Sequence, residues 1–467
     1  MSHRLAGLLV LAALISLTLK DSAVAAVAKT GFYRIESENG VAWLVDPAGV
    51  RTISAGVDGV GYRGNTIGHT DRAPYREACE AKYGSEGAWR EAAARRLDGW
   101  GFNTLGSWSD PQLAGVAVGH GRHLAYAVTL DLGAHFVAHR TGDRSAWEHG
   151  VFPDVFDPEF AQFVAADARR QIASLADDAN VLGWFTDNEL RWGPDWRGHD
   201  ELIVEFLNLP AGTPGREAAV ALLHLRHPDL AALNAAWGTA FADWTALSAG
   251  KDKVSVSYSR RKLAKQNTED VRATGGGAFF ADCDAFLSQL AERYFHDTDA
   301  AIAAAAPHQL RFGCRFAYPP GAPVVAAAAR YLDAISFNCY NEDPRGVIGR
   351  YSVFHKPMII GEFSFRGLDS GLPNTKGAGA RVPTQADRAK AFESFVREAL
   401  GEPLLIGYHW FTHVDEPAEG RFDGENSNYG VVNIRDEPYA ALVETMTRIN
   451  GEAVSIHAKA TGNTGVR

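Results

Sequence analysis

Two apolar stretches in this chain end abruptly on a glutamate, and this pattern constrains the fold more than any other feature. Residues 181–192 read VLGWFTDNELRW, so an apolar run turns polar and reaches Glu189. Residues 357–365 read PMIIGEFSF and carry Glu362 in the same place. Buried strands that deliver a carboxylate at their carboxyl ends are typical of a parallel (β/α)8 barrel. One such glutamate is often only salt-bridged, but two favour paired acid–base and nucleophile chemistry on a glycosidic bond.

All eight strands of such a barrel can be placed along the chain, including the two that end on these glutamates. Strands are expected at residues 50–57, 101–105, 124–130, 181–185, 310–315, 334–338, 358–361 and 404–410. Helical periodicity falls between them, at residues 88–100, 158–176, 280–305 and 386–400. Alternation of strand and helix predicts an α/β fold, a (β/α)8 TIM barrel.

The domain organisation follows from the same patterns. We expect an N-terminal β-hairpin at 29–50, the catalytic barrel at 51–450 and a C-terminal tail at 451–467. A long insertion follows the fourth strand, at about 190–280. It carries helices at 201–207, 217–225 and 229–237 and a polar loop or lid at 251–277. Long polar loops inside compact domains are usually functional or mobile.

Residues 1–28 have the pattern of a signal peptide. Arg4 precedes an apolar run at 5–19, and small residues follow at 23–28. The run is shorter than the ~20 residues of a spanning helix, which favours export and cleavage over an uncleaved anchor. We therefore expect a periplasmic or secreted protein with no integral membrane segment once the signal is removed.

The net charge argues against a nucleic-acid-binding protein, and the spacing of cysteines and histidines argues against a metal site. The formal net charge is −10, with no basic stripe for nucleic acid. The four cysteines permit at most two disulfides. Cys314 and Cys339 fall near the ends of neighbouring strands and could pair, although free buried thiols are the favoured interpretation. No C-x-x-C or HExxH spacing is present. The acidic loop at 415–430 lacks regular calcium-loop spacing, so we expect neither metal nor cofactor.

The candidate catalytic groups are Glu189 and Glu362. Burial and the neighbouring carboxylate should raise the pKa of Glu189, which suits a general acid. Asn188 can then bind a ring hydroxyl next to the reacting carbon, and Glu362 can act as the nucleophile. Asn338 and Tyr340, at the end of the sixth strand, are placed to orient Glu362.

Other residues are expected to contact the sugar. Trp410, at the end of the eighth strand, is predicted to form a stacking floor, with barrel core as the alternative. His409 beside it could bind a hydroxyl. The rim of the pocket is predicted to include Trp108, His135, Asp415 and Asn428.

Several of these stretches resemble a known family. Asn188-Glu189 with Glu362 looks like clan A of the glycoside hydrolases, which are retaining enzymes on (β/α)8 barrels. The segments GFNTLGSW (101–108), GWFTDNEL (183–190), GYHWF (407–411) and NYG (428–430) resemble the family 50 β-agarases, and the likeness runs over about 31–439. LNAAWGT (233–239) is similar to a segment of family 42 β-galactosidases. Family 50 usually carries a large β-sandwich before its barrel, where this sequence has the hairpin.

The resemblance implies a β-galactosidic or similar bond, with Glu189 as acid/base, Glu362 as nucleophile and Asn188 as a hydroxyl contact. The leading hypothesis is an exported retaining β-glycosidase, exo-acting on agar- or galactan-derived oligosaccharides. An endo-acting hydrolase of another β-linked polysaccharide is the second. A non-catalytic sugar-binding barrel is the third, and the presence of both glutamates argues against it. The sequence does not indicate an oligomeric state.

Overall fold

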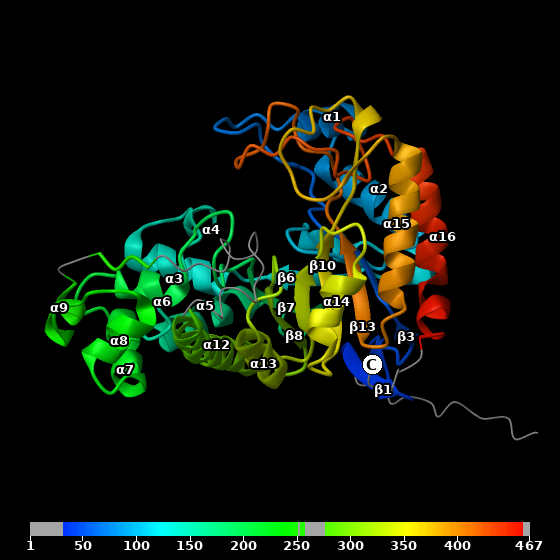
Figure 1. Cartoon of the computed structure of the whole chain (residues 1–467). Helices are drawn as coiled ribbons and strands as arrows, with labels where there is room; N and C mark the ends of the chain where they lie inside the picture. The colour runs from blue at the N-terminus through cyan, green and yellow to red at the C-terminus, as the bar shows by residue number, and fades with distance from the viewer. Residues whose placement is uncertain (1–30, 251–252, 257–275, 461–467) are drawn as a thin grey trace, which may run out of the picture.

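The centre of the molecule is a closed ring of eight parallel strands (Figure 1). The computed structural model describes residues 31–250, 253–256 and 276–460. In chain order the strands are β4 (Ser54–Val57), β5 (Thr104–Leu105), β6 (Ala125–Thr129), β7 (Val181–Asn188), β8 (Leu310–Arg315), β9 (Ile335–Asn338), β10 (Met358–Phe363) and β13 (Leu405–Trp410). A parallel bridge between Phe316 and Phe337 joins β8 to β9 and closes the ring. The predicted (β/α)8 barrel is confirmed.

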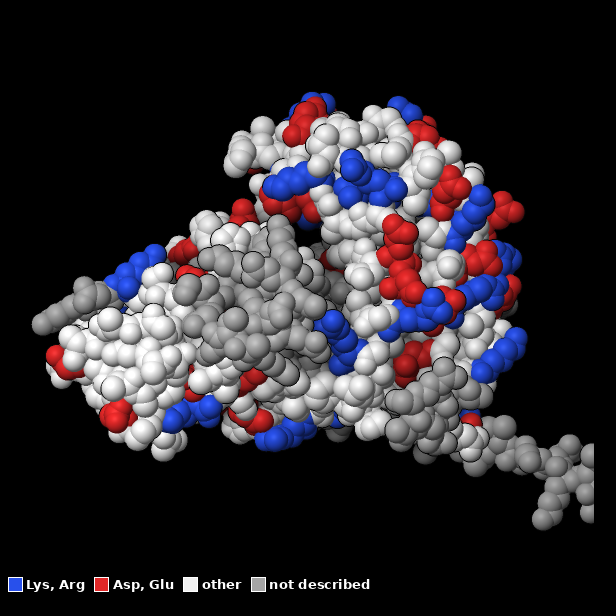
Figure 2. Space-filling model, in the orientation of Figure 1, with Lys and Arg blue, Asp and Glu red and all other residues white. Residues whose placement is uncertain are grey.

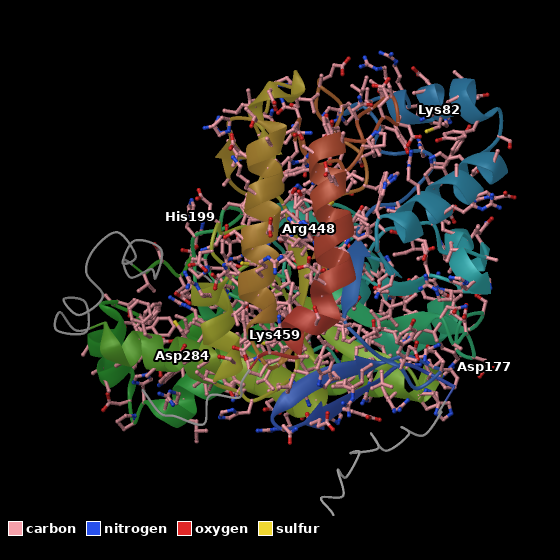
Figure 3. The ribbon with its side chains drawn as sticks, turned by 90° about the vertical axis from the view of Figure 1, so that its right-hand side faces the viewer. Lys82, Asp177, His199, Asp284, Arg448 and Lys459 are labelled. Carbon is pink, nitrogen blue, oxygen red and sulfur yellow. The ribbon has the colours of Figure 1, made fainter. Side chains whose placement is uncertain are left out.

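Helices surround the ring. They are α1 (Pro74–Tyr83), α2 (Glu86–Gly99), α3 (Leu132–Thr141), α4 (Ala146–His149), α5 (Phe160–Ile172), α12 (Gly277–Ala305), α13 (Ala322–Tyr331), α14 (Arg345–Ser352), α15 (Gln385–Leu400) and α16 (Ala440–His457). Helices α15 and α16 lie side by side (Figure 3), joined by ion pairs from Arg397 to Glu452 (2.8 Å) and from Arg448 to Glu393 (2.7 Å). Helix α16 continues past residue 450, so the described barrel extends into the region expected to be a tail.

The insertion after β7 folds as a helical lobe (Figure 1). It contains α6 (Leu202–Leu207), α7 (Pro214–Arg226), α8 (Leu230–Trp237) and α9 (Trp244–Ala249). The lobe is anchored on α12, where buried Asp282 accepts a hydrogen bond from Trp237 Nε1 (2.8 Å) and pairs with Arg226 (2.5 Å). The segment similar to family 42 lies on α8. Most of the predicted polar loop, at 251–252 and 257–275, lies outside the described residues.

The N-terminal sheet lies across the amino ends of the barrel strands. The predicted hairpin forms β1 (Arg34–Glu38) and β2 (Val41–Val45), and β3 (Arg51–Thr52) adds a third antiparallel strand. The predicted first barrel strand is therefore divided, because polar Arg51 pairs with Glu38 of the hairpin while the barrel strand begins at Ser54. From β2, Ala42 and Leu44 join the apolar cluster inside the barrel and seal its lower end.

All four cysteines are buried and free, so Cys314 and Cys339 do not pair. Among the described residues, no helix has the length and apolar character needed to cross a membrane. The predicted signal peptide and the last residues, 461–467, lie outside the described ranges.

Candidate active site

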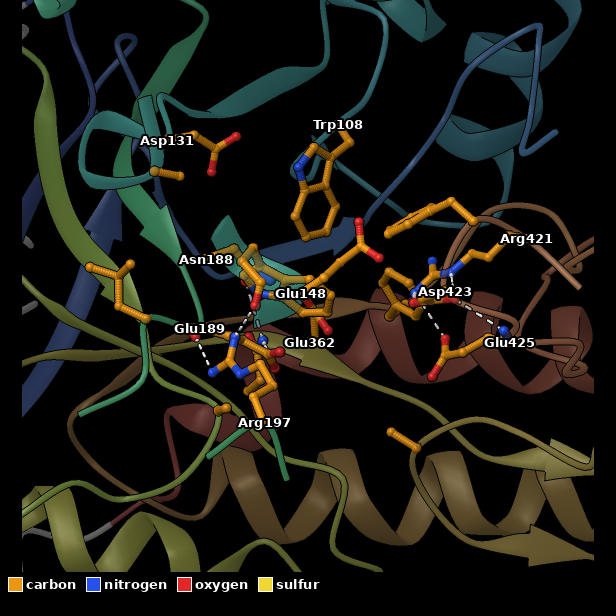
Figure 4. A pocket seen from close by; sticks show the side chains of 18 of the residues that line it. Trp108, Asp131, Glu148, Asn188, Glu189, Arg197, Glu362, Arg421, Asp423 and Glu425 are labelled. Carbon is orange, nitrogen blue, oxygen red and sulfur yellow. Dashed lines mark hydrogen bonds and ion pairs between the residues drawn. The ribbon is translucent and has the colours of Figure 1, made fainter. Parts of the chain in front are cut away.

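A cavity of about 1580 Å³ opens over the carboxyl ends of the barrel strands. The space-filling view shows this face hollowed between the helical lobe and the part that carries α1 and α15 (Figure 2). Both candidate catalytic glutamates line the cavity, and Figure 4 shows them close to one another. The strongly exposed aromatic side chains of the described chain also line it, namely Trp108, Trp196, Tyr318 and Phe422. Exposed aromatic rings gathered in one cavity are suited to stacking on apolar faces of a ligand.

Glu189 is placed by an unusual backbone conformation at the end of β7. Its φ of 50° lies in the left-handed region, where a side chain such as glutamate is strained. Its amide donates to the carbonyl of Arg315 (2.9 Å), and its own carbonyl accepts from Arg197 Nη2 (2.7 Å). The side chain accepts a hydrogen bond from Asn338 Nδ2 at Oε1 (2.9 Å).

Burial raises the pKa of Glu189 to about 7, and the negative charge of Glu362 adds to the increase. The hydrogen bond from Asn338 opposes this shift because it favours the carboxylate. A buried carboxyl with a pKa near 7 can hold a proton at neutral pH and release it to a leaving group.

Glu362 lies in a contrasting environment. Its Oε1 is 3.1 Å from Nη1 of Arg315, and its Oε2 accepts a hydrogen bond from the Tyr340 hydroxyl (2.6 Å). The side chain is almost completely buried. The guanidinium and the hydroxyl hold the two oxygens of this carboxyl and fix its direction.

Arg315 is the centre of a buried charged network beneath the cavity. Its Nη2 is 2.7 Å from Oδ2 of Asp58, which follows β4, and its guanidinium lies 4.7 Å from the Trp108 ring. Burial raises the pKa of Asp58 to about 7, although Arg315 opposes the change. Two glycines leave room for these groups. A Cβ at Gly106 would lie 1.9 Å from Asp58 Oδ1, and one at Gly361 would lie 2.6 Å from Arg315 Nε.

Known proteins share this sequence and fold. No family model matches the chain. β-Agarase B of Vibrio sp. (strain JT0107) is 31% identical over 398 residues, 82% of this chain and 39% of that protein. β-Agarase A of the same strain is 31% identical over 394 residues, 79% of this chain and 36% of that protein. The chain thus spans less than half the length of these curated relatives.

Solved structures extend the likeness. The agarase AgWH50C is 26% identical with a TM-score of 0.73, covering 92% of this chain and 66% of that one. PfGH50B is 25% identical with the same TM-score, covering 93% of this chain and 67% of that one. In sequence and fold, this chain resembles the family 50 agarases. The resemblance inferred from the strand motifs is confirmed.

The agarase-like site contains several of the residues predicted for it. Asn188, Trp108, His135, Asn338 and Tyr340 all line the cavity. Tyr340 makes the predicted hydrogen bond to Glu362. Asn338 is predicted to orient Glu362, but this is wrong, because its side-chain amide donates a hydrogen bond to Glu189 instead. His135 is held by Asp167 (2.8 Å from Nδ1) at the cavity wall.

Two predicted sugar contacts on β13 are not in the cavity. Trp410 is fully buried outside the ring, where it packs on Phe363 and Phe392 and donates from Nε1 to the carbonyl of Tyr429 (2.9 Å). The alternative interpretation, barrel core, is therefore correct. His409 points into the barrel interior and bonds Ser54 Oγ (2.9 Å), and burial lowers its pKa to about 3. Neighbouring residues of a strand point to opposite faces, and neither of these two reaches the cavity.

Asp415 and Asn428 are also internal rather than part of the rim. Asp415 Oδ1 accepts hydrogen bonds from Asn428 Nδ2 and the Gly430 amide (both 2.8 Å), and Oδ2 accepts from the Tyr439 hydroxyl (2.5 Å). Both side chains are buried. They fold the loop after β13, and other residues of that loop, Arg421, Phe422, Asp423 and Glu425, line the cavity.

Sequence reasoning missed three groups at the carboxyl ends of barrel strands: Asp58, Asp131 and Arg315. Asp131 follows β6, has a φ of 54°, and lines the cavity (Figure 4). Within the described chain its carboxylate has no hydrogen-bond partner, and burial raises its pKa. The signal was available, because each of the three lies where a predicted strand ends. Arg197, in the loop after β7, had no such signal.

Proposed function

We propose that this barrel hydrolyses β-galactosidic bonds of agar-type galactan oligosaccharides by a retaining double displacement. The observation that carries the proposal is the contrast between the two glutamates in one cavity. Glu189 has a raised pKa of about 7, whereas the Glu362 carboxyl is paired with the Arg315 guanidinium and accepts a hydrogen bond from the Tyr340 hydroxyl. Acid-assisted glycosidic cleavage requires a carboxylic acid that gives up its proton and a second carboxyl group aimed at the anomeric carbon, and these two environments suit those roles.

In the first step Glu362 attacks the anomeric carbon as the bond from that carbon to the glycosidic oxygen breaks. The Glu189 carboxylic acid transfers its proton to this oxygen, so the leaving sugar departs as a neutral alcohol. The products of the step are a glycosyl ester on Glu362 and a Glu189 carboxylate.

In the second step the Glu189 carboxylate removes a proton from water. The water oxygen attacks the anomeric carbon, and the ester bond to Glu362 breaks. Two inversions give a product with the original β configuration, and both glutamates return to their starting states. The Asn188 amide is placed to donate hydrogen bonds to sugar hydroxyls or accept them, and the Asp131 carboxylate is placed to accept them, in both steps.

Exo-action is the cleavage mode that we propose. The loop after β10 is bound to the loop after β13 by buried residues, and other residues of both loops line the cavity. The backbone amide of Asn428 donates a hydrogen bond to Asn374 Oδ1 (2.8 Å), and Ser427 Oγ donates one to the Lys376 carbonyl (2.7 Å). Joined loops of this kind support a wall that ends the cleft on one side. The apolar N-terminal pattern supports export to the periplasm or the medium as part of the same proposal.

Proton NMR on the first-formed anomer tests the mechanism. With agarose-derived oligosaccharides and aryl β-galactosides, the protein should release the β-anomer first. Glu362→Gln should lower kcat on the order of 10⁴-fold, as loss of a nucleophile does in other covalent catalysts. Glu398→Gln makes the same change on an exposed side chain of α15, outside the cavity, and is the control. Release of the α-anomer, or full activity in Glu362→Gln, would contradict the mechanism. Product lengths over time separate exo- from endo-action.

A further inference from the structure

Arg197, in the loop after β7, is a buried cation that the proposed reaction does not use. Its side chain is 3% exposed, and all three guanidinium nitrogens donate hydrogen bonds. Nε and Nη2 bind Asp195 Oδ2 (3.0 and 2.6 Å), and Nη1 binds the Trp147 carbonyl (3.0 Å). Nη2 also binds the Glu189 carbonyl (2.7 Å), as Figure 4 shows. A planar guanidinium bound at every nitrogen has one orientation, so it fixes the groups around it relative to one another.

The orientation of Arg197 is set within its own loop. The Asp195 amide donates to the Gly198 carbonyl (2.9 Å), and the Arg197 amide donates to Asp195 Oδ1 (2.7 Å). The guanidinium also lies 4.3 Å from the Trp196 ring. Residues 195–198 thus form a closed turn whose carboxylate aims the arginine, and the arginine joins this turn to Glu189.

The Glu189 backbone has a conformation that needs support from its surroundings. Its φ of 50° is strained, and strained conformations persist where the contacts around them hold them in place. The Glu189 amide donates to the Arg315 carbonyl (2.9 Å), and the Glu189 carbonyl accepts from Arg197. Peptide groups are planar, so φ and ψ alone decide where Cβ points relative to the chain. The two hydrogen bonds therefore aim the Glu189 carboxyl together.

The positive charge of Arg197 does not account for its place beside the acid. Burial raises the pKa of Glu189 to about 7, the charge of Glu362 adds to the increase, and the Arg197 guanidinium opposes it. A cation beside a general acid works against the protonated form that the acid needs. The hydrogen bond to the Glu189 carbonyl is the contribution that serves the reaction.

We propose that Arg197 is a positioning residue for the acid/base catalyst and acts through the Glu189 backbone. Its hydrogen bond holds the Glu189 carbonyl and so fixes the direction from which the carboxyl meets the glycosidic oxygen. Asp195 aims Arg197 and shares this role. The inference rests on the proposed function, and it makes acid catalysis in the barrel dependent on the loop that begins the helical insertion.

The dependence of the rate on the leaving group tests the inference. A dinitrophenolate leaves without a proton whereas a phenol needs one, and kcat/KM reports the first step, in which the leaving group departs. With phenyl β-galactoside, Arg197→Ala should lower kcat/KM about 100-fold, the size of loss that a misplacement of about 1 Å can cause. With dinitrophenyl β-galactoside the fall should stay below about threefold, because acid catalysis contributes little there.

Two further variants keep this test specific. Asp195→Asn preserves the shape of the turn and removes the charge that aims Arg197, so it should show the same dependence on the leaving group at a smaller size. Arg216→Ala is the matched control, because buried Arg216 donates to the carbonyls of Leu209 (2.7 Å) and Ser248 (3.0 Å) in the insertion and does not line the cavity. It should lower stability and affect both galactosides alike. Equal losses for both galactosides in Arg197→Ala and Asp195→Asn would overturn the inference.

A crystal structure of Arg197→Ala gives a readout that does not depend on turnover. We expect φ of Glu189 to leave the left-handed region and the hydrogen bond from Asn338 to be lost. If Glu189 moves in this way but the wild type hydrolyses no β-galactoside, the proposed function is refuted and the positioning of Glu189 by Arg197 stands. Hydrolysis that depends on Glu189 and Glu362, together with an unmoved Glu189 in Arg197→Ala, keeps the function and overturns the inference.

Discussion

The two ends of the barrel differ in how their residues are used. At the lower end, Ala42 and Leu44 of the N-terminal sheet pack against Leu182, Phe312 and Ile406 in an apolar cluster. At the upper end, buried polar atoms of Asp58, Arg315, Asn338 and Glu362 have no hydrogen-bond partner within the described chain. The lower end is closed by apolar packing, whereas at the upper end Asn338 and Glu362 line the cavity and keep polar atoms without a hydrogen-bond partner in the described chain.

Strained backbone conformations also occur at the upper end. Three residues near the carboxyl ends of barrel strands have a positive φ: Trp108 (59°), Asp131 (54°) and Glu189 (50°). Such conformations cost on the order of 1–3 kcal/mol each and gather at functional sites. The difference teaches that stability comes from the packed lower end and from the helices, and that the upper end holds strained, charged groups ready for substrate.

Arg315→Met is the change that should disturb the upper end most. It leaves Asp58 and Glu362 buried together without their shared cation, so we expect a loss of about 3 kcal/mol in the free energy of unfolding and at least a ~100-fold fall in kcat/KM. Urea unfolding and hydrolysis assays measure the two. Arg397→Met removes a partly exposed pair between α15 and α16 and should cost less than ~1 kcal/mol. Equal costs for both variants would contradict the contrast.

Leu44→Ala tests the lower end. The side chain is buried in the apolar cluster, so its truncation should lower the free energy of unfolding by about 3 kcal/mol while kcat/KM changes less than about twofold. Val50→Ala, nearby in sequence but 59% exposed, should leave stability within about 0.5 kcal/mol. A large loss of activity in folded Leu44→Ala would show that the two ends are not independent.

Tyr340→Phe should affect chemistry more than stability. It removes the hydroxyl that donates to Glu362 (2.6 Å), and a charge-assisted hydrogen bond of this kind amounts to about 1.5–3 kcal/mol, or roughly 10- to 100-fold in kcat. Tyr351→Phe is the matched control, because that buried hydroxyl has no partner in the described chain. Thermal unfolding should be similar for both variants, and an unchanged kcat in Tyr340→Phe would remove its role in positioning Glu362.

The sequence predicted the upper end through one rule, that a buried strand ends on a functional group. The rule located Glu189 and Glu362, and the structure extends it to Asp58, Asp131 and Arg315, which were present at strand ends but not selected. It failed at residues 404–410, an almost wholly apolar run in which periodicity does not separate His409, inside the ring, from Trp410, outside it.

Tertiary contacts explain the other failures. Asp415 and Asn428 have the composition of a binding loop, but they satisfy one another across that loop, and no local pattern distinguishes the two cases. Arg197 lies near Glu189 because the loop after β7 turns back toward the end of the strand. The residues around Arg197 in the sequence do not indicate this turn. Residues that act through long-range hydrogen bonds carry no periodic signal.

The smallest predicted effect is a shift in a pH profile. The Glu189 acid must be protonated to act, and its pKa is raised to about 7, so kcat/KM should fall as pH rises through about 7. Asn338 donates to Glu189 and favours the carboxylate, so Asn338→Ala should raise this pKa further and move the basic limb to higher pH. Asn433→Ala removes an equivalent bond to Glu437 on the surface and should leave the limb in place. If the basic limb moves to lower pH in Asn338→Ala, the limb belongs to a group other than Glu189. The hydrogen bond from Asn338 then does not set the pKa of the acid that limits catalysis.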